Sequence, residues 1–218
     1  MRIAVINGSP KGKNSITLQT TLYLSKKYTE HEFEVLNAAQ IIKLLERDFS
    51  RAEKILTSAD AVIFSYPVYT FLAPYGLHRF IELLKASGID LSGKYATQIS
   101  TSKHFFDVTA ARYVEDNIAD FGMKYVNGLL ADMDDLLKKE GRAEAERFFE
   151  YFLWSIEKGH CDARPAITSL TPYSPVMATL PSPAAEGGER DIVIITDETD
   201  PNSSLSAMIM IIGSRNSA

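Results

Sequence analysis

Short apolar runs alternate with segments of helical periodicity over about the first 160 residues, and this alternation restricts the possible folds more than any other feature of the chain. The runs are short and rich in β-branched residues, which is typical of buried strands. Strands that alternate with helices through short connections form a parallel sheet covered by helices on both faces. We expect strands at residues 2–7, 33–36, 61–64, 95–100 and 124–130, and helices from 14 or 15 to about 28 and at 50–58, 73–87, 108–121 and 142–157.

Five strands joined by helices predict an α/β fold with a flavodoxin-like, doubly wound five-stranded parallel sheet. The uninterrupted apolar run Ala61-Val62-Ile63-Phe64 indicates a strand buried on both faces, as such a sheet requires. In a sheet of this kind, a ligand binds beyond the carboxyl ends of the strands, where the strand order reverses. The loops that follow the strands are therefore the places to search for a site.

The composition changes after residue 160, which we take as the end of the first domain. Residues 161–190 hold five of the nine prolines and a Gly187-Gly188 pair, so we interpret them as a linker. Residues 191–218 again suggest a strand and a helix, with an Asn-Ser pair between them that echoes the start of the chain. Two interpretations stay open, namely the opening of a truncated second domain or a sixth strand that completes a sheet.

Composition and charge exclude several classes of function. A net charge of −5 gives no reason to expect a nucleic-acid partner. The single cysteine, Cys161, cannot form an internal disulfide, and no cluster of ligands has the spacing of a metal site, which fits a reducing cytoplasm. The apolar run Ile3–Ile6 is too short for a signal peptide or a membrane span. We expect a cytoplasmic protein without a bound metal.

The segment Gly8-Ser9-Pro10-Lys11-Gly12-Lys13-Asn14-Ser15-Ile16-Thr17 joins the first strand to the first helix. Unpaired N–H groups at a helix N-terminus, the helix dipole and nearby hydroxyls favour an anion such as a phosphate monoester there. The segment matches neither G-x-G-x-x-G nor the Walker loop, so a dinucleotide Rossmann site or an ATPase is disfavoured. The alternative is a capped helix after an ordinary turn.

This segment resembles the FMN-phosphate loop of the NAD(P)H-dependent FMN reductase and flavodoxin-like quinone reductase families, where FMN is flavin mononucleotide. The resemblance covers about residues 1–128. It implies that Ile16 contributes only its backbone. It also implies that the phosphate is surrounded by Ser9, Lys11, Asn14, Ser15 and Thr17.

Two further loops extend the resemblance to the flavin ring. The first, after the third strand, has two prolines that stiffen it, aromatic area for a flat ring, and N–H groups of Val68, Tyr69 and Thr70 that can reach the ring's polar edge. The second, after the fourth strand, contains hydroxyls, and Lys103 or His104 can stabilise negative charge on a reduced flavin. The alternative is that His104 is a surface or loop histidine with no redox role. The expected cofactor-binding residues are Pro67, Val68, Tyr69, Thr70 and Phe71 in the first loop and Ser100, Thr101 and Ser102 in the second.

The rest of the first domain carries two notable patterns. The aromatic residues of helix 142–157, from Phe148 to Trp154, indicate core packing, with a subunit contact as the alternative. The acidic stretch Asp132, Asp134 and Asp135 indicates a solvated helix cap rather than a metal site.

Together these features predict an FMN-dependent oxidoreductase that passes reducing equivalents from NAD(P)H to a quinone, a flavin, another small acceptor or a redox protein. The flavin carries the chemistry, so we nominate no catalytic residue. The family resemblance implies a homodimer. The sequence leaves the choice between NADH and NADPH open. Two rival interpretations are an electron-transfer flavodoxin-like module and a flavin-free interaction domain or fragment.

Overall fold

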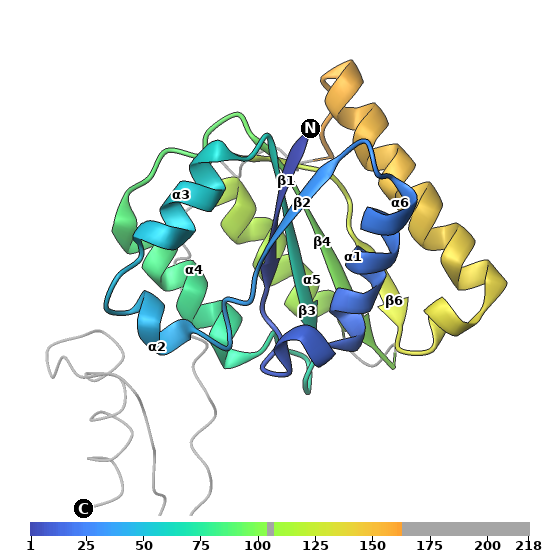
Figure 1. The fold of residues 1–218 in the computed structure, drawn as a ribbon, viewed down its shortest axis with the longest axis horizontal. Helices are drawn as coiled ribbons and strands as arrows, with labels where there is room; N and C mark the ends of the chain where they lie inside the picture. The colour runs from blue at the N-terminus through green and yellow to red at the C-terminus, as the bar shows by residue number, and fades with distance from the viewer. Residues whose placement is uncertain (104–106, 163–218) are drawn as a thin grey trace, which may run out of the picture. The chain divides into compact units, whose positions relative to one another are not determined.

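The protein folds into a parallel sheet between two layers of helices in a computed structural model that describes residues 1–103 and 107–162 (Figure 1). The strand order is β2-β1-β3-β4-β5, with β6 also paired to β4. The strands are β1 (Arg2–Asn7), β2 (Glu32–Leu36), β3 (Ala61–Pro67), β4 (Tyr95–Ser102), β5 (Lys124–Tyr125) and β6 (Leu129–Asp132). The helices are α1 (Ile16–Lys27), α2 (Ile42–Leu45), α3 (Ser50–Ser58), α4 (Tyr75–Ser87), α5 (Asp107–Asp120) and α6 (Lys139–Lys158), with single 3₁₀ turns η1 (Gly12–Asn14) and η2 (Asp135–Leu137).

Each face of the sheet has its own hydrophobic core, because side chains alternate between the two faces along every strand. In β1, Ala4 and Ile6 pack toward α2 to α5, whereas Ile3 and Val5 pack toward α1 and α6. Figure 1 shows the resulting layers, with α2, α3 and α4 on one side of the sheet and α1 and α6 on the other. The predicted α/β fold with a doubly wound, flavodoxin-like sheet is confirmed by this strand order.

The predicted strand 124–130 was wrong as a single strand. It is divided into β5, which pairs with Tyr95 and Ala96 of β4, and β6, which pairs with residues from Ile99 onward. The pairing offset increases by one residue between the two segments, so the chain contains a one-residue bulge. Gly128 lies in this bulge, where a Cβ would come within 2.6 Å of the Gln98 carbonyl oxygen. The fifth strand therefore bends where it passes β4.

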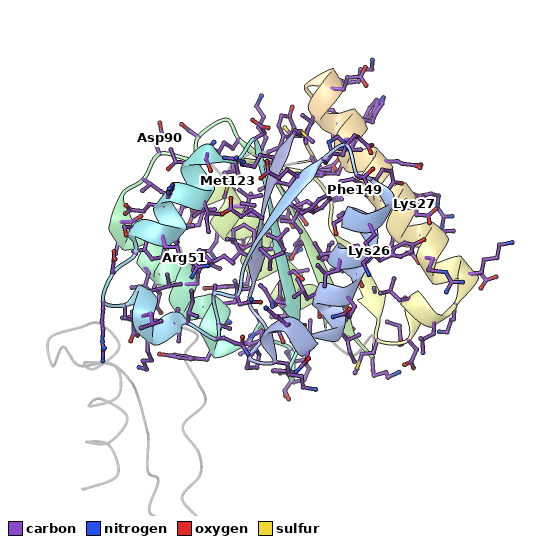
Figure 2. The ribbon with its side chains drawn as sticks, in the orientation of Figure 1. Lys26, Lys27, Arg51, Asp90, Met123 and Phe149 are labelled. Atoms are coloured by element: carbon purple, nitrogen blue, oxygen red, sulfur yellow. The ribbon has the colours of Figure 1, made fainter. Side chains whose placement is uncertain are left out.

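The aromatic residues of α6 mostly fill the core, as predicted. Phe149 and Phe152 are fully buried beneath the helix, and Phe148 is 9% exposed. Figure 2 shows Phe149 between α6 and the sheet, where its ring contacts Tyr28 at a centroid distance of 4.8 Å. Trp154 remains 46% exposed, so the core explanation does not extend to the outer face of the helix.

Other predictions concern parts of the chain that the structure does not describe. Apart from its first two residues, the predicted linker 161–190 lies outside the described residues, as does the strand and helix expected within 191–218. The division into domains stays a prediction. Within residues 1–103 and 107–162, no helix is both long and apolar enough to cross a membrane. The same residues contain no cluster of three or more potential metal ligands.

Candidate functional site

A pocket of about 320 Å³ opens at the carboxyl ends of β1, β3 and β4. Its position follows from the topology, because the chain adds β2 on one side of β1 and β3 on the other. The strand order reverses at this point, which is where doubly wound sheets bind ligands. The pocket is lined by Ser9, Lys11, Ser15, Ile16, Thr17, Pro67, Val68, Tyr69, Thr70, Thr101, Ser102, Lys103 and Met133.

Asn7, the last residue of β1, organises the loop that follows it. Its Oδ1 accepts a hydrogen bond from the Ser9 N–H at 3.1 Å. Its Nδ2 donates to the Gly12 carbonyl at 3.0 Å and to Asn37 Oδ1 at 2.9 Å. The side chain is fully buried, so these bonds fix the path of the loop over the sheet edge. The sequence reasoning missed this residue, although a polar side chain that ends an apolar strand is a recognisable signal.

The first turn of α1, whose N–H groups have no acceptor within the helix, lines the pocket. Ser15 is the N-cap, and its Oγ accepts from the Leu18 N–H at 3.4 Å. The N–H groups of Ile16 and Thr17 belong to the first helical turn and have no intrahelical acceptor. Both residues line the pocket together with Lys11. This end of the pocket is built for an anion, because N–H groups, the helix dipole and a cation converge there.

The two glycines of the loop have packing roles. A Cβ at Gly8 would lie 2.7 Å from the Cβ of Leu77 in α4. Gly12 has φ = +53°, a left-handed conformation that side chains other than glycine rarely adopt. Both residues let the loop lie close to the body of the protein.

Two buried hydroxyl contacts lie at the floor of the pocket. Thr17 Oγ1 of α1 and Thr101 Oγ1 of β4 are 2.5 Å apart, and one hydroxyl donates to the other. Ser102 Oγ donates to the buried carboxylate of Asp107 at 2.8 Å. The proton of Ser102 is thus directed away from a ligand, whereas the threonine pair keeps one proton that can be donated into the pocket.

The loop after β3 forms a tight turn from Tyr69 to Leu72. The Tyr69 N–H donates to the Leu72 carbonyl at 2.9 Å and the Leu72 N–H donates back at 3.2 Å. The two residues in the middle of the turn, Thr70 and Phe71, have φ values of 45° and 73°. Left-handed residues other than glycine cost about 1–3 kcal/mol each and are common at functional sites. The turn holds Tyr69 at the pocket with 45% of its surface exposed.

One expectation about this loop was wrong. The N–H groups of Val68, Tyr69 and Thr70 were expected to reach the polar edge of a flavin ring, but those of Val68 and Tyr69 are used within the protein. Val68 donates to the Thr101 carbonyl at 2.9 Å, and Tyr69 donates within the turn. The hydrogen bond from Val68 links the loop to β4 and so fixes the position of the loop.

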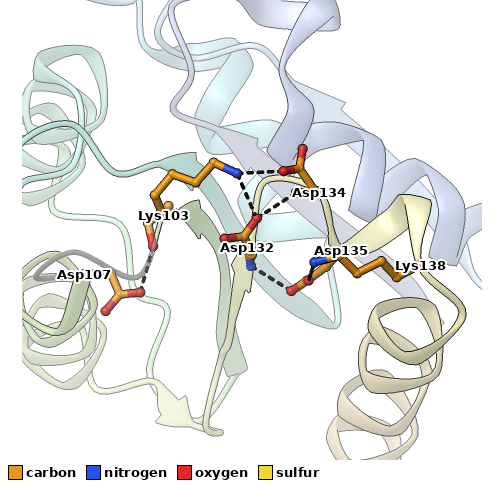
Figure 3. A network of polar contacts seen from close by, with 7 residues as sticks. Lys103, Asp107, Asp132, Asp134, Asp135 and Lys138 are labelled. Carbon is orange, nitrogen blue, oxygen red and sulfur yellow. Dashed lines mark hydrogen bonds and ion pairs between the residues drawn. The ribbon is translucent and has the colours of Figure 1, made fainter.

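Lys103 is held by two carboxylates at the rim of the pocket (Figure 3). Its Nζ donates to Asp134 Oδ2 at 2.7 Å and to Asp132 Oδ1 at 3.3 Å. The hydrogen bond to Asp134, followed by that to Asp132, raises the pKa of Lys103. The pKa of Asp132 is lowered, chiefly because it accepts from the Asp134 N–H. The Lys103 ammonium is therefore charged and hydrogen-bonded to these two carboxylates.

The acidic stretch 132–135 shapes the turn between β6 and η2. Asp135 Oδ2 accepts from the Asp132 N–H at 2.7 Å, and Asp132 Oδ1 accepts from the Asp134 N–H at 3.0 Å. Neither η2 nor α6 has a side-chain hydrogen bond at its N-cap, so the predicted helix cap was wrong. The carboxylates instead satisfy backbone donors of the turn and bind Lys103.

Most of the predicted site residues are brought together in this one pocket. Asn14, Phe71 and Ser100 are not among its lining residues, and Ser100 is buried within β4. His104 lies outside the described residues. The sequence gave Ile16 a backbone role and missed Met133 altogether, and both residues line the pocket. Met133 follows β6, and its N–H donates to the Ser102 carbonyl at 3.1 Å, which places it beside the end of β4.

The sequence profile of a known protein family matches residues 1–133, which include every residue that lines this pocket. The family is described as NADPH-dependent FMN reductase. The chain belongs to this family. The protein is accordingly a flavin-dependent NAD(P)H oxidoreductase with FMN as its cofactor. None of the curated protein sequences compared with the chain matches it.

Solved structures resemble this FMN reductase family member in fold. A NADH:FMN oxidoreductase called EMOB, in its apo form, is 20% identical over 75% of this chain and 91% of its own, with a TM-score of 0.60. General stress protein 14 of Treponema denticola, in complex with FMN, is 13% identical over 70% and 98%, with a TM-score of 0.54. The NAD(P)H:quinone oxidoreductase of Methanothermobacter marburgensis is 14% identical over 72% and 96%, also with a TM-score of 0.54.

The pocket of this family member fits FMN in its chemistry. FMN has a doubly charged phosphate at one end and a flat, largely apolar ring at the other. The first turn of α1 and Lys11 offer the donors and the positive charge that a phosphate requires. Three apolar residues that line the pocket are also 38–45% exposed, namely Ile16, Tyr69 and Met133, and they supply apolar surface. Apolar side chains left exposed around a polar floor are a suitable seat for an aromatic ring.

Proposed function

We propose that this FMN reductase family member binds FMN in the pocket beyond β1, β3 and β4 and passes electrons from NAD(P)H to a small flat acceptor, such as a quinone or a free flavin. The observation that carries the proposal is the mixed chemistry of the pocket. The first turn of α1 and Lys11 line it together with the exposed apolar side chains of Tyr69 and Met133.

In this proposal each group of residues has a separate task. The hydroxyls of Ser9, Ser15 and Thr17 and the N–H groups of Ile16 and Thr17 hold the phosphate, with Lys11 as counter-charge. Thr101 supports Thr17 from β4. Tyr69 and Met133 flank the ring. Asn14, Phe71 and Ser100 stay in the proposed set as residues next to the pocket that act through the backbone or through packing.

When bound, FMN accepts hydride from the nicotinamide and delivers electrons to the acceptor, so the chain itself needs no acid–base residue. The protein's own contribution is to orient the cofactor and leave one face of the ring accessible. The half-exposed Tyr69 and Met133 favour an acceptor that stacks on an apolar rim. This supports quinones and flavins over strongly hydrated acceptors.

The proposal also includes a cytoplasmic homodimer. The single cysteine and the absence of an internal disulfide support a reducing compartment. In the family that the sequence resembles, the flavin ring is often shared between subunits, which supports a homodimer by analogy. Sedimentation equilibrium of the purified protein tests the dimer.

The reductase activity is tested by anaerobic titration of the FMN-loaded protein with NADPH and, separately, with NADH. We expect the flavin absorbance to bleach with at least one donor and to return when menadione is added. A protein that holds FMN but does not bleach is an electron-transfer module. A protein that remains colourless after incubation with FMN contradicts the proposed function.

The phosphate end is tested by Lys11→Gln, with Lys13→Gln as its matched control. Lys11 lines the pocket, whereas Lys13 is an exposed neighbour on the same loop that does not. Loss of a charge-assisted contact to phosphate should weaken FMN binding about tenfold. Quenching of FMN fluorescence measures both affinities. Equal losses of FMN affinity in Lys11→Gln and Lys13→Gln would mean that the loop attracts FMN only through its overall positive charge.

A further inference from the structure

The rim of the pocket beside Lys103 carries more negative than positive charge. Lys103 contributes one positive charge, and its two partners, Asp132 and Asp134, contribute two negative charges. The adjacent Asp135 is balanced by Lys138, with Nζ 3.5 Å from Oδ1. This group of five side chains therefore has a net charge of −1, and Figure 3 shows them gathered around the turn after β6.

Lys103 is one of the two residues, with His104, that the sequence suggested as a counter-charge for a reduced flavin. The structure directs its ammonium toward Asp132, the last residue of β6, and Asp134, in the turn that follows. The Asp132 carboxylate is held in place because its Oδ1 also accepts from the Asp134 N–H, and the Asp132 N–H donates to Asp135 Oδ2. The side chain of Asp132 is 19% exposed, whereas those of Lys103 and Asp134 are 58% and 56% exposed, so solvent screens the contact with Asp132 less than the contact with Asp134.

We propose that Asp132 and Asp134 are positioning residues that hold Lys103 at the rim and set the charge felt by the FMN ring. They cancel the attraction that Lys103 would exert on an electron-rich ring. The pocket then binds reduced FMN less tightly, relative to oxidised FMN, than it would with Lys103 unpaired. FMN held in this way gives up its electrons more readily. This inference rests on the proposed function, since it requires FMN in the pocket.

Three variants form a charge series at this rim. Asp134→Asn removes one negative charge and leaves Lys103 paired with Asp132, for a net charge of zero. Lys103→Met removes the positive charge and gives a net charge of −2. The double variant returns the net charge to −1. Asp120→Asn is the matched control, because Asp120 forms an exposed ion pair of similar length, 2.8 Å, with Lys85 and does not line the pocket.

The readout is the ratio of the dissociation constants of oxidised and reduced FMN, obtained from the midpoint potential of the bound flavin at a pH where the reduced ring is anionic. We expect Asp134→Asn to raise this ratio by about three- to tenfold in low salt and Lys103→Met to lower it by a similar factor. The double variant and Asp120→Asn should remain close to the wild type. The shifts should shrink as the salt concentration rises.

A purely structural tie between the two loops gives a different result. Breaking the ion pair from either side would then move the ratio in the same direction, and the double variant would resemble the singles. That outcome, or no shift in either single variant, overturns the inference while FMN binding itself remains. Failure of the wild type to bind oxidised FMN contradicts the proposed function and the inference with it.

Discussion

The buried contact between Thr17 and Thr101 is the residue-scale feature that joins the two sides of the pocket. The threonines come from α1 and β4 and are 0% and 4% exposed. Two hydroxyls in contact share one proton, and the second proton is available to a ligand. A single contact between these residues therefore affects both the stability of the pocket floor and the donors that the floor presents.

We expect Thr17→Val to destabilise the protein by about 1–3 kcal/mol, because the variant leaves the Thr101 hydroxyl buried without its partner. Thr17→Val/Thr101→Val removes both hydroxyls and should cost less than Thr17→Val alone. Urea unfolding without FMN measures both free energies. The contrary result is a double variant that loses more free energy of unfolding than Thr17→Val and Thr101→Val lose when their losses are added. That result would show that the contact is not the reason for the loss.

The sequence was informative at residues whose role depends on position along the chain. The N-cap of α1 could be narrowed to Asn14 or Ser15 because the segment follows a strand and opens a helix, and helix capping is a local property. In the structure the N-cap is Ser15. Lys103 and Met133 are different, since each is placed by contacts with residues about 30 positions away in the chain. Local patterns cannot reveal such contacts.

At the scale of the elements, α6 is held to the sheet by its aromatic face. Phe149 is fully buried against Tyr28 and Phe33. Phe149→Ala should lower the free energy of unfolding by about 3–5 kcal/mol, since it leaves a cavity under the helix. Trp154→Ala, on the exposed face, should cost about 1 kcal/mol or less. Chemical denaturation distinguishes the two, and equal losses would mean that Trp154 is covered in solution.

Helices α1 and α6 are also joined by a polar contact with a pH dependence. Lys27 and Tyr23 of α1 donate to Glu146 of α6, and these bonds lower the pKa of Glu146, with Lys27 as the larger cause. A carboxyl group with a lowered pKa stabilises the fold above its unfolded pKa, about 4.3. That stability is lost as the pH falls through the folded-state pKa.

We expect Glu146→Gln to be less stable than the wild type at neutral pH and to lose less stability on acidification. The two proteins should become similar in stability below the folded-state pKa of Glu146. Urea unfolding from about pH 7 down to about pH 3 measures this convergence. Parallel stability curves over that range would show that Glu146 does not contribute through its charge.

The elements themselves were predictable where a segment is long and periodic, as in β1, β3 and α4. The short helix α2 was missed, because four residues are too few to show a helical period. The bulge between β5 and β6 was missed for another reason. It depends on the close approach of Gly128 to the Gln98 carbonyl, which is a tertiary contact. The sequence shows only a single glycine at this position, which does not by itself indicate a bulge.

At the scale of the whole molecule, the order of strands and helices determines the position of the site. Alternation of strands and helices predicts the parallel sheet, and the reversal of strand order between β1 and β3 then locates the pocket. The loops at that edge carry the chemistry, and the family match covers the same part of the chain. Fold and cofactor class therefore follow from the first 133 residues, whereas the electron acceptor depends on finer details of the rim.

A crystal structure of the protein soaked with FMN tests the central claim most directly. The account predicts density for a phosphate within hydrogen-bond distance of the Ile16 and Thr17 N–H groups, and for a ring against Tyr69 and Met133. Density for FMN at another place on the protein, or a phosphate that avoids the first turn of α1, would contradict it.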